Sequence, residues 1–379
     1  MILWESESKK PIACKVAVAG DFLPGGGLRP RQGRSWSGMA KEVSACFADV
    51  AVSFVNLEGP LGTGTVQPSR PPGLGGNLCG PPEALDYLEP LRASVIGFAN
   101  NHIYDCGRGG LLLTKEIVQR HGMAGIGAGR TLKEVPETHV WKGPEEVKVG
   151  FWAAANITPH PSKTRREGTE VGTQKRASDA LREMRSQGAT FTIALLHAGL
   201  EHTNYPDPAD VKLMTAMADA GFDVVAACHS HRISGHTMRY GEEDGRPSFC
   251  FFGLGSLSSG VVYSSLEKEG VIVVAGLSRQ GSLECIEIRP VFLDEAGWGT
   301  LPDKETEEHF LKRFIRLSEE ILEDSYARLF YKDVSRGLIR RHYADALSAF
   351  RGGGIRDVAQ KCSRLRMKHL YRFIHSIRM

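Results

Sequence analysis

The amino-acid sequence predicts an α/β fold in which sheets are covered by helices. Short apolar runs of strand length recur along the chain as far as residue 277. Amphipathic helical patterns lie between several of them, and strands that alternate with helices are typical of this class. The 379 residues are 41% hydrophobic and 24% charged, which is the composition of an ordinary globular protein. Such a chain has room for one large domain with an appendage, or for two domains.

The expected elements can be placed from their patterns. Apolar runs predict strands at residues 12–22, 51–57, 94–99, 147–155, 190–198, 222–228, 248–254 and 270–277. Helical periodicity predicts helices at 109–121, 175–187 and 208–220. After Trp298 the composition shifts toward helix formers, and residues 303–331 are strongly amphipathic. We therefore expect a main domain at 12–298 and a C-terminal helical extension with a basic tail at 299–379.

Composition also bears on the compartment. No stretch approaches eighteen consecutive apolar residues, so the sequence predicts no transmembrane segment. The segment MILWESESKK lacks the apolar core of a secretory signal, and the expected location is therefore cytoplasmic. The eight cysteines are scattered without a Cys-x-x-Cys pair. This distribution argues against a zinc ribbon or a disulfide scaffold and fits a reducing compartment.

The positive charge is concentrated in the tail. Residues 336–379 contain eleven Lys or Arg and two Asp, a net charge of +9, so the rest of the chain carries −6. Three glycines at 352–354 precede a last expected helix, 355–378, with apolar residues on one face and basic residues on the other. We expect this helix to dock on the acidic main body; weak contact with anionic lipid or an acidic protein is the alternative. Nucleic-acid binding is not expected, because the basic residues are confined to the tail.

Polar residues of the metal-binding type stand at one repeated place, at the end of a predicted strand. They are Asp21, Glu58, His102, His197 and His229. In α/β folds the loops after the strands converge on one edge of the sheet, where sites are built. The shared placement predicts that these side chains meet in one site.

The residue types suit a metal centre. His229 and His231 can both reach a metal if the turn between them splays their rings, and the amide oxygen of Asn101 can serve as a neutral ligand. Asp21 and Glu58 supply the negative charge that two close dications need. Taken singly, each residue also has an ordinary interpretation as a surface side chain, a hydrogen-bonded core residue or a helix cap. The joint pattern favours the metal site.

Two further motifs are interpreted as structural. The run Gly125-Ile126-Gly127-Ala128-Gly129 lacks the strand–loop–helix frame of a phosphate-binding loop, so we expect a tight turn there. Cys106 follows the Asn101–His102 segment and could act as a nucleophile. Because no other catalytic signature supports that role, a packed thiol is expected.

The sequence resembles the CapA family of bacterial capsule-synthesis, poly-γ-glutamate-associated proteins, a branch of the calcineurin-like metallophosphoesterase superfamily. The motifs that carry the resemblance span about residues 12–260 and are VAVAGDFLPGG, FVNLEGPLG, ANNHIYDCGRGGLLLT, GMAGIGAGR, LLHAGLE, CHSH and FFGLGSL. The resemblance implies a four-layer α/β/β/α sandwich for the main domain, with the C-terminal helical extension outside it. It also implies one or two divalent metal ions, Mn, Fe or Zn.

The resemblance assigns expected roles to individual residues. The metal ligands it implies are Asp21, Glu58, Asn101, His197, His229 and His231, with Glu58 as the bridge. His102 would be the catalytic acid that protonates a leaving group. The expected supporting residues around these are Asn56, Asp105 and Glu201. Asp105 has an ordinary interpretation as a helix cap, and Glu201 as a surface charge.

Two departures from the superfamily pattern bear on the metal count. Leu23 stands where typical members have a histidine two residues after the first aspartate, and the bridging acid is Glu58 rather than an aspartate. One metal position is therefore short of a ligand.

Three functions are consistent with such a site. The first is a metal-dependent hydrolase with phosphoesterase-like chemistry on an anionic small molecule or polymer, or on a γ-glutamyl or peptide-like substrate. The second is a component of poly-γ-glutamate or capsule assembly. The third is a metal-binding scaffold without catalysis, which Leu23 makes conceivable.

Overall fold

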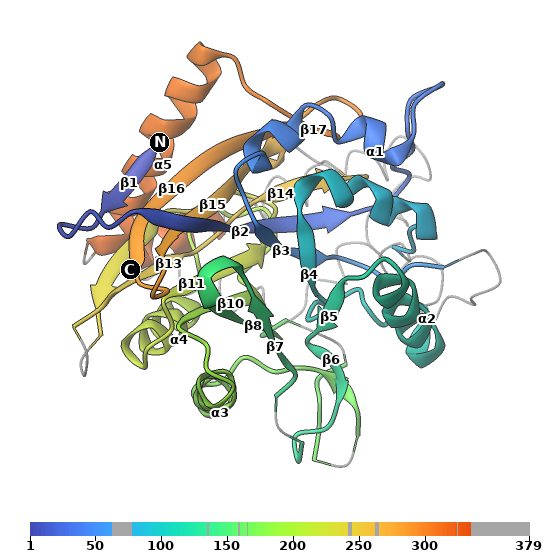
Figure 1. The fold of residues 1–379 in the computed structure, drawn as a ribbon. Coiled ribbons are helices and arrows are strands. Elements are labelled where there is room, and N and C mark those ends of the chain that lie inside the picture. Colours follow the sequence, from blue (N-terminus) through green and yellow to red (C-terminus); the bar gives the residue numbers. More distant parts are fainter. Residues whose placement is uncertain are drawn as a thin grey trace.

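The structure is a computed structural model that describes residues 1–62, 78–134, 136–157, 160–164, 166–241, 245–261, 265–323 and 325–334. Over these ranges the strands form two large mixed sheets and a short two-stranded ribbon (Figure 1). The ribbon pairs β6 (Ala128–Arg130) with β9 (Gly168–Thr169).

The larger sheet has the order β1-β16-β15-β2-β3-β4-β5, with β14 beside β2 and β17 beside β16. Its strands are β1 (Ile2–Glu5), β2 (Ile12–Leu23), β3 (Val52–Leu57), β4 (Ala93–Gly97), β5 (Ala124–Ile126), β14 (Ser256–Ser259), β15 (Glu269–Ser278), β16 (Leu283–Leu293) and β17 (Gly299–Thr300). The strands β2 to β5 are parallel, so they all end at the same edge.

The second sheet has the order β12-β13-β11-β10-β8-β7. Its strands are β7 (Thr138–Lys142), β8 (Lys148–Ala155), β10 (Phe191–Ala198), β11 (Val224–His229), β12 (His236–Tyr240) and β13 (Pro247–Phe251). The four inner strands are parallel, and β7 and β12 pair antiparallel at the two sides. The inner strands are continuous apolar runs because both of their faces are buried.

The core lies in three layers between four layers of secondary structure. In β10, Ile193 and Leu195 pack between the two sheets, whereas Ala194 and Leu196 pack under α3 (Gln174–Ser186) and α4 (Pro208–Asp219). In β2, alternate residues likewise face either the other sheet or the layer that contains α2 (Gly107–Arg120). The shorter helices of that layer are α1 (Trp36–Met39), η1 (Val43–Phe47), η2 (Pro82–Tyr87) and η3 (Glu89–Leu91). The expected four-layer α/β/β/α sandwich is confirmed.

The glycine-rich run at 125–129 belongs to β5 (Ala124–Ile126) and β6, with Gly127 at the bend between them. Gly127 has φ +100°, a backbone conformation that L side chains rarely adopt, and a Cβ there would lie 2.9 Å from the Cβ atoms of Ala99 and Ala153. The structural interpretation of this segment agrees with the geometry.

The helix α5 (Lys304–Leu322) packs at the side of the sandwich where β12 and β16 lie (Figure 1). Phe310 and Phe314 are buried in the layer between the sheets, and Phe310 contacts Phe292 of β16. Residues 326–334 form a further helical segment. The basic tail at 336–379, with its expected last helix and its docking or lipid contact, lies outside the described residues. In the part of the chain that is described, no helix is long and apolar enough to cross a membrane.

Candidate metal centre

The parallel strands of both sheets bring the expected ligands to one place. Asp21 lies in β2 and Glu58 directly after β3, both in the larger sheet, while His197 lies in β10 and His229 ends β11 in the second sheet. All four side chains are buried, with Asp21 0% and Glu58 1% exposed. The centre therefore sits where the ends of the two sheets meet.

This arrangement of side chains requires a glycine at position 20. A Cβ on Gly20 would lie 2.1 Å from the carbonyl oxygen of Gly255, so a larger residue would push apart the two segments beside Asp21. The register between β2 and β3 shifts at this point, between Ala19 and Asp21. The bulge places Asp21 beside Asn56 of β3.

One group of ligand atoms gathers around His197. Its Nε2 lies 2.7 Å from Asn101 Oδ1, 3.0 Å from His229 Nδ1 and 3.6 Å from Glu58 Oε1. Glu58, His197 and His229 can converge on one ion, and Asn101 adds an amide oxygen to the same side.

A second group gathers around His231. Its Nδ1 lies 3.3 Å from Asp21 Oδ2 and 3.8 Å from Glu58 Oε2. Glu58 thus turns one oxygen to each group, which is the geometry of a bridging carboxylate. Its Oε2 is buried and accepts no hydrogen bond from the described residues. A buried carboxylate oxygen in that state fits a cation ligand, so the residues present suit a divalent metal.

The acids and histidines of this cluster shift one another's pKa values. Burial and the nearby Asp21 carboxylate raise the pKa of Glu58 well above its usual value. Burial and His231 lower the pKa of His229 to about 3, and burial with His229 lowers that of His197. Although burial opposes its protonation, Glu58 and Asp21 raise the pKa of His231 to about 10. His197 and His229 are therefore neutral at physiological pH, the form in which imidazole binds metals.

The backbone of the histidine pair is strained. His229 has φ +106° and His231 has φ +54°, both in the region that favours glycine. Such conformations persist at functional sites only when the surroundings hold them. One such restraint is the hydrogen bond from the His229 backbone N–H to Asp21 Oδ2, which is 3.0 Å long.

Two asparagines orient the acids. Asn56 Nδ2 donates to Asp21 Oδ1 at 2.7 Å. Asn100 donates to Asn56 Oδ1 and to the carbonyl of Leu57, and its Oδ1 accepts the backbone N–H groups of His102 and Ile103. Sequence reasoning named Asn101 and missed this role of Asn100. An Asn that accepts from two following N–H groups is a known turn device, so the Asn-Asn pair was the available signal.

His102 belongs to neither ligand group. Its Nδ1 lies 2.7 Å from Asp105 Oδ2, and the same carboxylate oxygen accepts the backbone N–H of Leu78. Asp105 is buried, whereas the His102 side chain is 13% exposed. A carboxylate that fixes one ring nitrogen directs the other outward, which is the arrangement of a positioned acid–base histidine.

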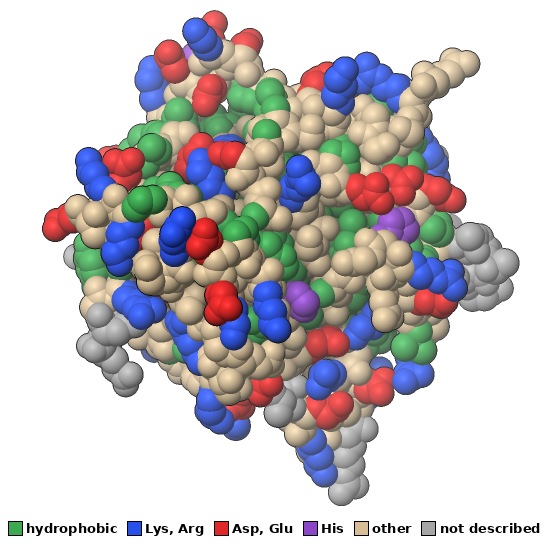
Figure 2. Space-filling view, viewed as in Figure 1, with side chains coloured by type: hydrophobic (Ala, Val, Ile, Leu, Met, Phe, Trp, Pro, Cys, Tyr) green, Lys and Arg blue, Asp and Glu red, His purple; other side chains and the backbone are tan. Residues whose placement is uncertain are grey.

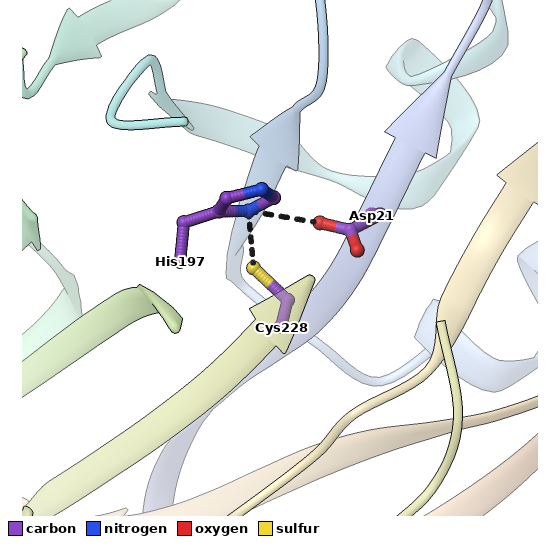
Figure 3. A group of neighbouring side chains, drawn as sticks. All are labelled: Asp21, His197 and Cys228. Carbon is purple, nitrogen blue, oxygen red and sulfur yellow. Dashed lines mark hydrogen bonds and ion pairs between the residues drawn. The ribbon is translucent and has the colours of Figure 1, made fainter. Parts of the chain in front are cut away.

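Three other residues lie around the two ligand groups. Glu201 lies 3.6 Å from His202, with a side chain 38% exposed, and belongs to neither ligand group. Leu23 is buried at the end of β2 and offers no ligand atom. Cys228, which sequence reasoning did not single out, points at His197 with its Sγ 3.4 Å from Nδ1, as Figure 3 shows with Asp21 on the same side of the ring.

Comparisons with known proteins bear on the family. The model of a family described as bacterial capsule synthesis protein PGA_cap matches residues 15–260. Capsule biosynthesis protein CapA of Bacillus anthracis is 27% identical over 156 residues, which is 39% of this chain and 37% of that protein. The match thus spans little more than a third of its relative. The resemblance carried by the sequence motifs is confirmed.

Solved structures with a related arrangement are more distant. A 5'-nucleotidase precursor from Thermus thermophilus is 15% identical with a TM-score of 0.46, over 82% of this chain and 60% of that one. A calcineurin-like phosphoesterase from Bacillus subtilis is 13% identical with a TM-score of 0.44, over 83% of this chain and 100% of that one. Likeness at this level carries no inference about the reaction.

Proposed function

The chain belongs to the bacterial capsule synthesis protein family PGA_cap, and we propose that it is a metal-dependent hydrolase with phosphoesterase-like chemistry. The observation that carries the proposal is the pair of ligand groups that share Glu58, one around His197 and one around His231. Histidine, amide and carboxylate ligands suit Mn, Fe or Zn, as one ion or two. The His231 group, with Asp21 and Glu58, has one ligand residue fewer than the His197 group, which Asn101 completes.

The chain's own residues take distinct roles in this proposal. A bound divalent ion supplies a Lewis acid and a nucleophilic water at neutral pH. This ion would be held by the proposed ligands, which are Asp21, Glu58, Asn101, His197, His229 and His231. His102 gives a proton from the ring nitrogen opposite Asp105 to the departing oxygen, and Asp105 keeps that ring in place.

An anionic substrate is supported by a pocket beside the loop that carries His102. The pocket has a volume of about 510 Å³ and is lined by Tyr104, Gly107, Arg108, Thr131, His160, Arg166 and Glu167. Arg108 is paired with Glu167 at 3.0 Å, which leaves the charge of Arg166 as the excess. A volume of this size accommodates a group as large as an amino acid or a sugar phosphate. A phosphate ester or a γ-glutamyl, peptide-like chain has both the negative charge and the size that suit this pocket.

Metal analysis followed by turnover tests this proposal. The purified protein is expected to contain one or two Mn, Fe or Zn per chain and to hydrolyse bis-p-nitrophenyl phosphate when Mn²⁺ is added. Asp21→Asn should lose both metal and turnover, whereas Asp179→Asn, at a surface ion pair of α3, should lose neither. Absence of metal and turnover in the wild-type protein would refute the hydrolase.

A second candidate is a part in capsule assembly, and the relative named as a capsule biosynthesis protein favours it. In that case the centre would bind metal and an anionic polymer without releasing phosphate. Metal binding with no turnover of any phosphodiester would support this candidate, or the non-catalytic scaffold. Binding of a γ-glutamate oligomer by calorimetry separates these two, since a bare scaffold has no affinity for the polymer.

A further inference from the structure

A second polar cluster lies behind the strained histidine pair. Its centre is Glu267, from the short helix η5 (Ser265–Lys268), whose side chain is 2% exposed. Its Oε1 lies 2.8 Å from His202 Nδ1 and 3.8 Å from Arg232 Nη2. A buried carboxylate shared by an imidazole and a guanidinium fixes both side chains in place.

Both partners of Glu267 reach the metal loop directly. The backbone N–H of His202 donates to the carbonyl of Ser230 at 2.9 Å, and Ser230 is the residue between His229 and His231. Arg232 is the next residue after His231, and its carbonyl accepts the hydroxyl of Ser230. The cluster therefore restrains the His229–His231 segment at its middle, through His202, and at its end, through Arg232.

Backbone strain shows why such a hold is needed. His202 has φ +67°, so three histidines around this loop, with His229 and His231, take conformations that favour glycine. Each costs on the order of 1–3 kcal/mol unless its surroundings compensate. Asp21 restrains the loop through the His229 N–H, and the Glu267 cluster restrains it through Ser230.

We propose that Glu267 is a positioning residue for the metal centre, acting through His202 and Arg232 to set the distance between His229 and His231. The proposal rests on the metal centre put forward above. Through these two partners, Glu267 fixes the backbone on which both ligands stand. Arg232 also donates to Asn204 Oδ1 at 3.2 Å, and the Asn204 N–H donates to Asp333, so residues 326–334 are joined to the same cluster.

The chain offers a matched control for this role. Glu269, two residues further on, is a largely buried glutamate, with a side chain 14% exposed, that is paired with an arginine, Arg313 of α5. Its ion pair is thus with the C-terminal helix, while the charge of Arg232 has only a smaller effect on its pKa. Glu267→Gln and Glu269→Gln each remove one buried carboxylate charge, and Glu267→Ala also removes the acceptor for His202. If Glu267 positions the loop, its two substitutions differ from Glu269→Gln at the centre and not in general stability.

Two measurements on these variants decide the matter. Hydrogen exchange of the metal-free protein should show faster exchange over residues 229–232 in Glu267→Gln, faster still in Glu267→Ala, and no change there in Glu269→Gln. Calorimetric titration with Mn²⁺ should show a dissociation constant raised about 10–100-fold by Glu267→Gln and unchanged by Glu269→Gln. Equal effects of both substitutions, or none from Glu267→Gln, would overturn the positioning role. Should the wild-type protein bind none of Mn²⁺, Fe²⁺ and Zn²⁺, the proposed function fails while the exchange data still decide the role of Glu267.

Discussion

At the scale of single residues, His102 is set apart from the other histidines by its partner. His197 and His229 face each other and Glu58, whereas His102 is bound to the buried Asp105. A histidine that is hydrogen-bonded to a carboxylate keeps one tautomer and one ring orientation. A proton donor needs both, and the contacts among the ligand residues do not provide them for His102. The roles of the histidines therefore follow from their neighbours and not from their spacing in the chain.

Replacement of His102 by Ala tests this division of roles. Turnover of bis-p-nitrophenyl phosphate should fall about 10²–10⁴-fold, the usual contribution of a general acid, with metal content unchanged. His309→Ala, on the exposed face of α5, is the matched control and should change neither quantity. Loss of metal in His102→Ala, measured by elemental analysis, would make His102 a ligand and contradict the assignment.

The candidate site was predictable from sequence only where a residue's role follows from its place on a strand. Strand ends predicted that Asp21, Glu58 and His197 would meet, because parallel strands end at a common edge. The roles of Asn100 and Glu267 depend on which segments fold back beside the ligands. No local pattern encodes those contacts, since both residues act through partners distant in the chain.

At the scale of elements, the long apolar strands were predictable, whereas β12 and β16 were not. The expected strand at 190–198 corresponds to β10 (Phe191–Ala198), since a strand buried on both faces is a continuous apolar run. β16 (Leu283–Leu293) was missed because it alternates charged with apolar residues, and β12 (His236–Tyr240) because three of its five residues are exposed. The helix expected at 303–331 is two helical segments, with α5 ending at Leu322.

The contribution of α5 to stability can be measured at Phe314. This ring is fully buried and stacks on Phe310 and on His236 of β12. Phe314→Ala should lower the free energy of unfolding by about 3–5 kcal/mol, since it leaves a cavity at the side of the core. Ile315→Ala, at the next and 41% exposed position, should cost less than about 1 kcal/mol in the same urea titration. Equal costs would mean that α5 does not pack into the sandwich as described.

The same interface predicts a pH dependence. Burial lowers the pKa of His236 to about 4, where its ring stacks between Phe251 and Phe314 and its Nδ1 contacts Ser318. An unfolded histidine titrates near pH ~6.5. Between these values the unfolded chain binds more protons, so the stability present above about pH 6.5 is lost as the pH falls toward 4. At about 1.4 kcal/mol per pH unit, the loss by pH 4 amounts to about 3 kcal/mol.

Unfolding by urea at a series of pH values checks this expectation. His236→Gln keeps a hydrogen-bonding side chain but cannot titrate, so its stability should fall less steeply between about pH 6.5 and 4. His309→Gln, on the exposed face of α5, should retain the wild-type slope. Identical slopes in wild type and His236→Gln would assign the acid sensitivity to other groups.

At the scale of the whole molecule, the proposed centre joins the two sheets. Asp21, Glu58 and Asn101 belong to the larger sheet and its loops, and His197 and His229 to the second sheet. On the face shown in Figure 2, acidic and basic side chains are interspersed rather than gathered by sign. The concentration of buried acid in the centre is therefore a local feature of the sheet ends, where it supplies negative charge for a cation.

Metal removal should accordingly destabilise the whole fold. Without a cation, Asp21 and Glu58 are two neighbouring buried acids at the end of the larger sheet, and their repulsion is part of what raises the pKa of Glu58. A metal that binds only the folded state adds about 2.7 kcal/mol at a free concentration roughly 100 times its dissociation constant. The melting temperature should therefore fall after dialysis against EDTA and recover with Mn²⁺ or Zn²⁺. Asp21→Asn should melt at one temperature with and without metal. A wild-type melting temperature indifferent to metal would contradict a centre that joins the sheets.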